Sequence, residues 1–237
     1  MATVLLARHG ETDWNREGRI QGWAPTALND RGHAQASALG MHLATTVDDG
    51  IGRLYASDLR RTRQTAAHLA EPLGLEPVHE PAWRERDFGV LQGLLADELA
   101  EQYPEYSLRV TGQPAASERP DSGETLLDVR ERVVDRYRAL RADLAPDETA
   151  LVVAHGGSIK LLLGAIREQD ARTAIVDQSM GNCGLSRIEL DPERDAGNGD
   201  GDGDGTTAGA ATADEVVAAN RTGFLTGTPA RDGSVTR

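Results

Sequence analysis

The stretch VLLARHGETDWNREGRIQGW, residues 4–23, begins with an apolar run that stops abruptly at Arg-His-Gly, residues 8–10. Such a short, continuous apolar run is typical of a strand that is buried on both faces of a sheet. LVVAHGGSIK, residues 151–160, repeats the pattern, and its apolar run also ends in a histidine followed by glycine. In open parallel sheets, ligands bind beyond the carboxyl ends of the strands. His9 and His155 are therefore candidate ligand-binding residues.

Strands and helices alternate along most of the chain. Near-continuous apolar strands in such an alternation favour an α/β fold, with a mostly parallel sheet flanked by helices on both faces. Residues 104–121, rich in Pro, Ser and Gly, are expected to form a loop. Ser57 and Asp58 are candidate caps of a following helix. We predict strands at 3–7, 53–56, 77–80, 149–154 and 184–190, and helices at 29–43, 59–73, 94–103, 122–144 and 157–166.

The composition changes near residue 193, where a segment rich in Gly and Asp begins. This pattern predicts a single catalytic domain over residues 1–192 and a disordered acidic tail over residues 193–237. The tail contains the start of a calcium-binding loop at residues 200–205, but Ala211 occupies the twelfth position, where an acidic ligand is required. Hydrophobic residues at 216–219 and 224–225 could dock on the domain.

Charge and cysteine content limit the classes of partner and the compartment. The formal net charge is −13, which argues against nucleic acid and anionic membranes as partners. No stretch reaches the roughly 20 apolar residues of a membrane span, and no signal peptide is visible. Cys183 is the only cysteine, which fits a reducing, cytoplasmic location. The sequence does not indicate an oligomeric state.

Arginine residues point to an anionic ligand. Arg8 precedes His9, and the block SDLRRTRQTA at residues 57–66 places Arg61 near the start of a predicted helix. Guanidinium groups match the oxygen atoms of phosphate in a bidentate geometry. The N-terminus of the helix that begins near Gly157 also favours an anion, through its free N–H groups.

Six blocks together resemble the histidine phosphatase superfamily, the phosphoglycerate mutase-like proteins. They follow the family's order and span roughly residues 3–190, which makes the resemblance specific. The blocks are ARHGETDWN (7–15), GRIQGWAPTALNDRGHAQA (18–36), SDLRRTRQTA (57–66), RERDFGVLQG (84–93), SGETLLDVRERV (122–133) and VVAHGGSIK (152–160).

The resemblance implies a phosphatase that acts through a phosphohistidine, with His9 as the nucleophile. Glu85 matches the family's proton donor, and His155 is the other catalytic histidine. Glu11 and Thr12 complete the motif and could be structural instead. No metal and no cofactor is implied, and the expected partner is a small phosphorylated metabolite. The implied phosphate-binding residues are Arg8, Asn15, Gln21, Gly22, Arg61 and Gly156.

Two alternatives remain open at the level of sequence. A cofactor-dependent phosphoglycerate mutase would be expected to carry a lysine where this chain has Ala96, and an arginine pair where it has only Arg109. A non-catalytic binding protein on the same fold would be expected to lack motif residues that are all present. A cysteine phosphatase is excluded, because Glu189 stands where such a phosphate loop, starting at Cys183, needs its arginine.

The acidic composition yields a prediction about salt. Lys160 is the only lysine, and carboxylates outnumber basic residues by 38 to 25. Repulsion among carboxylates destabilises a compact chain unless salt screens it, so the composition predicts a halophilic protein. We expect the melting temperature to rise as potassium chloride increases into the molar range, as measured by differential scanning fluorimetry. A flat or falling curve would contradict this explanation of the composition.

Overall fold

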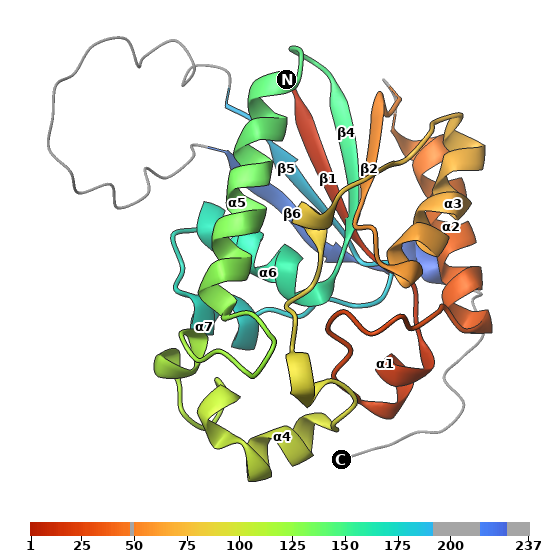
Figure 1. The fold of residues 1–237 in the computed structure, drawn as a ribbon. Helices are drawn as coiled ribbons and strands as arrows, with labels where there is room; N and C mark the ends of the chain where they lie inside the picture. Colours follow the sequence, from red (N-terminus) through yellow and green to blue (C-terminus); the bar gives the residue numbers. More distant parts are fainter. Residues whose placement is uncertain (48–49, 192–213, 227–237) are drawn as a thin grey trace, which may run out of the picture.

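Six strands form one mixed sheet in the order β3-β2-β4-β1-β5-β6 (Figure 1). The computed structural model describes residues 1–47, 50–191 and 214–226. Strands β1 to β4 run parallel to one another, whereas β5 and β6 are antiparallel to their neighbours. The strands are β1 (Thr3–Arg8), β2 (Arg53–Ala56), β3 (Val78–His79), β4 (Thr149–Ala154), β5 (Leu185–Glu189) and β6 (Glu215–Arg221).

Helices cover both faces of the sheet. Helices α2 and α3 pack together on one face, and α5, α6 and α7 lie on the other (Figure 1). The predicted α/β class, with a mostly parallel sheet between two helical layers, is confirmed. The helices are α1 (Asp13–Glu17), α2 (Asp30–Thr46), α3 (Arg60–Leu73), α4 (Ala96–Gln102), α5 (Leu126–Asp143), α6 (Gly156–Ile166) and α7 (Ala171–Val176). Short 3₁₀ segments occur at Pro81–Trp83, Gly89–Leu91, Pro104–Tyr106, Gln113–Ala116 and Gly223–Leu225.

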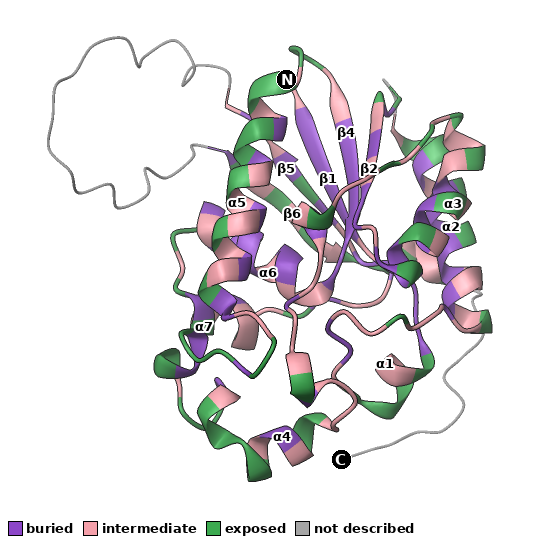
Figure 2. Cartoon of the chain, viewed as in Figure 1, coloured by how far each residue is buried: buried purple, intermediate pink, exposed green. Residues whose placement is uncertain are grey.

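The apolar periodicity of the sequence correctly identifies the buried helix faces. Residues spaced by three or four along a helix lie on one side of it, so they can be buried together. The long helix α5 buries Val129, Val133 and Leu140 against β1 and β4, while its opposite side is exposed (Figure 2). Each face of the sheet thus has its own apolar core, and the sheet separates the two.

One predicted helix start and one predicted helix cap are wrong, for local reasons. Helix α5 begins at Leu126 rather than at Ser122, because the Thr125 hydroxyl accepts the backbone N–H of Asp128 at 3.0 Å and caps the helix there. Ser122 has φ of +60°, which is incompatible with a right-handed helix. Helix α3 is preceded by Leu59 and has no side-chain cap. Ser57 and Asp58 instead contact side chains at the candidate site described below.

The domain boundary at residue 192 requires a correction for residues 214–226. They fall within the predicted disordered tail, yet residues 215–221 form edge strand β6, which pairs with β5. The side chains of β6 are alternately exposed and only partly buried, so the hydrophobic signal in the sequence is weak. Phe224, which follows this strand, stacks on the His42 ring with a centroid distance of 4.4 Å.

Asp214 ties β6 to the rest of the domain through a buried carboxylate that is 5% exposed. It accepts hydrogen bonds from the Tyr137 hydroxyl at 2.7 Å, from Arg141 Nε at 3.0 Å and from the Asp191 backbone N–H at 3.1 Å. The carboxylate therefore joins α5, the end of the β5 segment and the start of β6. The calcium-loop motif and the remainder of the predicted tail, 193–213 and 227–237, lie outside the described residues.

Among the residues that the structure describes, no helix combines the length and the apolar character needed to cross a membrane.

We expect Asp214→Ala to lower the free energy of unfolding by about 3–5 kcal/mol, because it leaves a partly buried guanidinium and a buried hydroxyl without their acceptor. Asp143→Ala is the matched control, since its carboxylate also pairs with an arginine but is 72% exposed. The control should cost less than about 1 kcal/mol. Urea unfolding followed by tryptophan fluorescence measures both values, and equal losses would contradict a structural role for Asp214.

Candidate active site

The register of β1 against β4 brings the two strand-end histidines together. Arg8 pairs with Ala154, and the backbone N–H of His9 donates to Ala154 O at 3.1 Å. The histidine rings consequently pack edge to face, with centroids 5.3 Å apart. A pocket of about 870 Å³ opens at this edge of the sheet, and Arg8, His9 and other residues of the candidate site line it.

Both nitrogen atoms of His9 have defined neighbours. Nδ1 lies 2.7 Å from the carbonyl oxygen of Gly10, so Nδ1 carries the proton and donates it there. Nε2 is then the basic nitrogen, and it accepts a hydrogen bond from Arg61 Nε at 3.2 Å. Burial, followed by the positive charges of Arg61 and Arg8, lowers the pKa of His9 well below its usual 6.5. His9 is therefore neutral at pH 7, with the lone pair on Nε2.

His155 is fully buried next to His9 and is not among the residues that line the pocket. Its Nε2 is 2.9 Å from the Ser57 hydroxyl, which explains why Ser57 does not cap α3. Nδ1 of His155 is buried and has no hydrogen-bond partner among the described residues. Burial, together with the charges of Arg61 and nearby groups, lowers the pKa of His155 well below 6.5, so this ring is also neutral at pH 7.

Arg61 is 1% exposed and brings a positive charge into the centre of the site. Its Nη2 donates to Gly22 O at 2.7 Å, and its Nη1 to Ala24 O at 3.2 Å. Burial lowers the pKa of Arg61 to about 10, so the guanidinium remains charged at pH 7. Arg8 contributes a second guanidinium, whose Nη1 donates to Met180 O at 2.6 Å.

The remaining predicted phosphate contacts also lie at the pocket, whose lining includes Asn15, Gln21, Gly22 and Gly156. The loop that carries Gln21 is anchored by its contacts with Arg61 and Thr26, and Thr26 donates to Gln21 Oε1 at 2.7 Å.

Glu11 and Thr12, whose roles the sequence left open, make structural contacts. The Thr12 hydroxyl caps α1 by accepting the backbone N–H of Asn15 at 3.1 Å. Glu11 is buried and forms an ion pair with Arg31. Both residues thus stabilise the loop that follows His9, and neither lines the pocket.

Glu85 also lines the pocket. Its carboxylate accepts the backbone N–H of Gly157 at 2.9 Å and that of Arg86 at 3.0 Å. Residue 157 must be glycine for this contact, because a Cβ atom there would collide with the Glu85 carboxylate. The first turn of α6 therefore holds an acid residue beside the two histidines.

A family model described as histidine phosphatase superfamily (branch 1) matches residues 4–197. The chain belongs to the histidine phosphatase superfamily. It is 34% identical over 169 residues to a 2,3-bisphosphoglycerate-dependent phosphoglycerate mutase from Bartonella tribocorum, covering 69% of this chain and 81% of the relative. A probable phosphoglycerate mutase from Cronobacter sakazakii is 34% identical over 192 residues, which cover 80% of this chain and 85% of that relative.

Solved structures resemble this superfamily member as well. A mycobacterial glucosyl-3-phosphoglycerate phosphatase superposes with a TM-score of 0.69 and 30% identity, over 79% of this chain and 92% of that chain. The Bacillus stearothermophilus protein YhfR superposes with a TM-score of 0.76 and 25% identity, over 95% of this chain and all of that chain (100%). The resemblance predicted from the six sequence blocks is thus confirmed at the level of the family.

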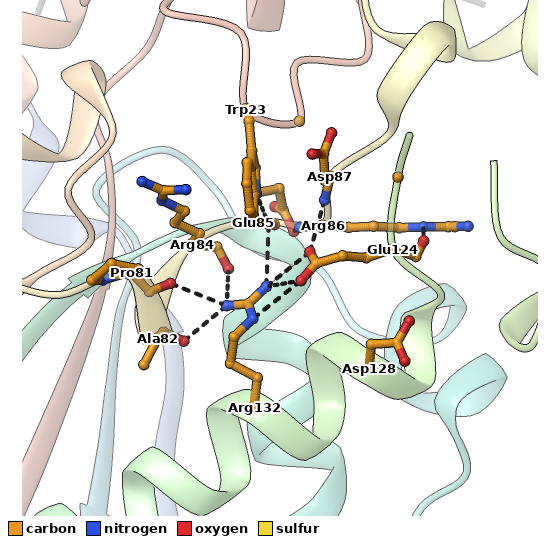
Figure 3. A network of polar contacts seen from close by, with 12 residues as sticks. Trp23, Pro81, Ala82, Arg84, Glu85, Arg86, Asp87, Glu124, Asp128 and Arg132 are labelled. Carbon is orange, nitrogen blue, oxygen red and sulfur yellow. Dashed lines mark hydrogen bonds and ion pairs between the residues drawn. The ribbon is translucent and has the colours of Figure 1, made fainter. Parts of the chain in front are cut away.

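Arg132 of α5 fixes the backbone that carries Glu85 (Figure 3). Its guanidinium donates to the carbonyl oxygens of Ala82 at 2.9 Å and Arg84 at 3.1 Å, and more weakly to that of Glu85 at 3.4 Å. It also forms an ion pair with Glu124 at 3.0 Å. A single planar guanidinium thereby contacts three carbonyl groups of the segment that carries Glu85.

Further contacts hold the segment around Glu85 in place. Glu124 accepts the backbone N–H of Asp87 at 2.9 Å, and the Trp23 indole donates to Glu85 O at 2.8 Å. Arg84 stacks on the Trp23 ring and pairs with Asp58, so Asp58 serves this segment rather than capping α3. Arg132 stands within the SGETLLDVRERV block, but the sequence analysis did not predict its role. The carbonyl groups that it contacts lie about 50 residues away in the chain, so no local motif indicates them.

Sequence reasoning also missed Ser57 as a partner of His155, and Asn182. The Asn182 amide donates to His9 O at 3.2 Å and to Asn15 Oδ1 at 3.1 Å. The neighbouring Cys183 is buried, and burial raises the pKa of its thiol to about 12, so it is not a nucleophile. Within the described ranges, no group of three or more His, Cys, Asp or Glu side chains could hold a metal ion.

We expect Arg132→Lys to slow phosphoester hydrolysis selectively, because an ammonium group cannot span the same carbonyl oxygens. If Glu85 protonates the leaving group, as the resemblance implies, alkyl phosphates should lose about tenfold or more in kcat/KM. Activated aryl phosphates, whose leaving groups need little protonation, should change little. Steady-state kinetics on both substrate classes measures the difference, and Glu85→Gln should show the same selectivity.

Arg136→Lys is the matched control for this experiment. Arg136 lies one turn further along α5 and pairs with Glu80 at 2.7 Å, but it makes no contact with the Glu85 segment at residues 84–86. It should leave the ratio between the two substrate classes unchanged. A loss in Arg132→Lys that is equal for both classes would mean that Arg132 only stabilises the fold.

Proposed function

We propose that this superfamily member is a phosphatase that hydrolyses a small phosphomonoester through a phosphohistidine on His9. The single observation that carries the proposal is the state of His9. A neutral ring whose Nδ1 proton is donated to Gly10 O presents a basic Nε2 beside two guanidinium groups. Cations next to a nucleophile favour both the neutral ring and the approach of a phosphate dianion.

In the proposed first step, Nε2 of His9 attacks phosphorus, and the bond from phosphorus to the ester oxygen breaks. Arg8 and Arg61 neutralise charge on the phosphoryl oxygens, which is the main requirement of phosphoryl transfer. Glu85 gives a proton to the departing alkoxide, which leaves as an alcohol. His155 does not itself line the pocket, but its unpartnered Nδ1 belongs to the ring that packs against His9. With the single proton of the neutral imidazole on Nδ1 and Nε2 accepting from the Ser57 hydroxyl, Nδ1–H is the proposed donor to a phosphoryl oxygen bound at His9.

In the second step, water attacks the phosphohistidine and Glu85 accepts a proton from it. The bond between phosphorus and Nε2 breaks, inorganic phosphate leaves, and His9 returns to its neutral form. The hydrogen bond to Gly10 O keeps Nδ1 occupied throughout, so one nitrogen performs both steps. The proposal uses protein cations to neutralise the phosphate charge and involves no metal ion or organic cofactor.

The similar proteins include two kinds of enzyme that transfer phosphoryl groups, phosphatases and mutases. The mycobacterial structural neighbour is named as a phosphatase of glucosyl-3-phosphoglycerate, whereas the relatives from Bartonella and Cronobacter are named as phosphoglycerate mutases. A mutase is therefore the second candidate. It must keep the phosphohistidine away from water while its substrate reorients, which favours additional cations in a covering segment. Here Ala96 and Arg109 line the pocket, and neither the expected lysine nor an arginine pair is present.

A side-by-side assay distinguishes the two candidates. We expect release of inorganic phosphate from a panel of small phosphomonoesters to exceed the rate of conversion of 3-phosphoglycerate to 2-phosphoglycerate, with bisphosphoglycerate supplied as primer. His9→Ala should abolish both turnover and the acid-labile phosphate label. Conversion at least about tenfold faster than phosphate release would support the mutase instead, and a label that persists in His9→Ala would disprove the proposed nucleophile.

A further inference from the structure

Gln35 is a buried polar residue on the apolar face of α2. It is 3% exposed, and its neighbours Ala36 and Leu39 belong to one of the two apolar cores. A buried amide is unfavourable for folding unless it finds a hydrogen-bond partner. Its Oε1 accepts the backbone N–H of Glu11 at 2.9 Å. Gln35 is not among the residues that line the active-site pocket, yet it binds the chain two positions after His9.

The peptide group that Gln35 binds also contacts the ring of His9. The N–H of Glu11 and the carbonyl group of Gly10 belong to the same planar peptide unit. The oxygen of that carbonyl accepts the hydrogen bond from His9 Nδ1 at 2.7 Å. Because the unit is planar, the direction of its N–H sets the direction of its C=O. Gln35 therefore orients the oxygen atom that holds the His9 ring.

The backbone around Gly10 is fixed on its other sides as well. The N–H of Gly10 donates to Thr65 Oγ1 of α3 at 3.1 Å. A Cβ atom on Gly10 would collide with the carbonyl oxygen of Gly32, so the chain packs directly against the first turn of α2. Helices α2 and α3 together hold this segment, and Gln35 supplies the side chain that bonds the peptide behind His9.

The contact between His9 and Gly10 O gains strength when the ring is charged. As Nε2 bonds to phosphorus, the ring becomes a cation that keeps its Nδ1 proton, and hydrogen bonds from charged donors are roughly twice as strong. The hydrogen bond from Arg61 to Nε2 is lost in that step, because phosphorus takes the lone pair. Burial and the charges of Arg61 and Arg8 lower the pKa of His9, whereas the hydrogen bond with Gly10 raises it.

Resting on the phosphatase function proposed above, we propose that Gln35 is a positioning residue for phosphoryl transfer. It keeps Gly10 O aligned with Nδ1–H of His9, so that the positive charge on the ring is stabilised while the N–P bond forms. The proton stays on Nδ1 in both steps, and the charge disappears when water breaks the N–P bond. A contact that strengthens towards the transition state acts on kcat rather than on KM.

The test uses Gln35→Met, which is similar in size but has no amide oxygen. The N–H of Glu11 would then be buried without its acceptor, and the peptide should turn towards another partner. We expect kcat for p-nitrophenyl phosphate to fall about 10- to 100-fold, the usual effect of losing a group that orients a functional imidazole. KM should stay within about threefold, because the pocket lining is unchanged.

A nuclear magnetic resonance signal tests the geometry without relying on activity. The Nδ1–H proton of His9 is identified as the imidazole signal that is missing in His9→Ala. In the wild-type protein its hydrogen bond to Gly10 O should shift this signal downfield and slow its exchange with water. Both effects should weaken in Gln35→Met.

Gln64→Met is the matched control. The Gln64 side chain of α3 also accepts a backbone N–H at 2.9 Å, from Leu28, and neither residue lines the pocket. It should change neither kcat nor the Nδ1–H signal. Gln35→Glu retains an acceptor oxygen and should keep kcat within about threefold of wild type. If Gln35→Met does not fold, Gln35→Asn takes its place, because it withdraws the oxygen by about 1.5 Å.

Two outcomes would overturn the role of Gln35. One is an unchanged kcat and Nδ1–H signal in Gln35→Met, or in Gln35→Asn where that variant replaces it. The other is an equal loss of kcat in the Gln35 and Gln64 variants, which would make Gln35 merely structural. A wild-type protein that does not hydrolyse p-nitrophenyl phosphate would contradict the phosphatase proposal instead, and the Nδ1–H signal would then decide whether Gln35 orients Gly10 O.

Discussion

Arg8 and Ala154 are directly opposite each other where β1 and β4 run in parallel, and this register brings His9 and His155 to one edge of the sheet. Side chains alternate between the two faces of a strand, so a slip of one residue would move the histidine of one strand to the wrong side. Buried residues along both strands prevent such a slip, because Val4 and Leu6 belong to one apolar core and Leu5 to the other. The packing of the core thus determines the geometry of the site.

The centre of the site combines features that are individually unfavourable for folding. Arg61 and His9 are almost completely buried, and the pKa of each is lowered by that burial. Carbonyl groups of the loop that carries Gly22 accept hydrogen bonds from Arg61 and offset part of the cost. The same arrangement leaves a neutral imidazole next to permanent positive charge, which is the condition that the proposed attack on a phosphate requires.

Helix α5 links the stability of the domain to the position of the acid. At its N-terminal half, Arg132 holds the backbone of the Glu85 segment, and towards its C-terminal end Tyr137 and Arg141 bind the buried carboxylate of Asp214. Residues far apart in the chain are therefore joined by one rigid element. The two arginine contacts depend on donors in fixed directions, which a guanidinium provides and a flexible ammonium group does not.

The sequence by itself determined the fold class, the buried helix faces, the family and most of the charged and polar residues of the candidate site, because apolar periodicity and short motifs are local properties of the chain. Tertiary structure decided the rest. Only the folded chain shows that His155 contacts Ser57, that Arg132 binds the backbone of the Glu85 segment, and that β6 completes the sheet. These features depend on hydrogen bonds between residues about 50 to 100 positions apart, or on a half-exposed edge strand, and neither leaves a periodic signal in the sequence.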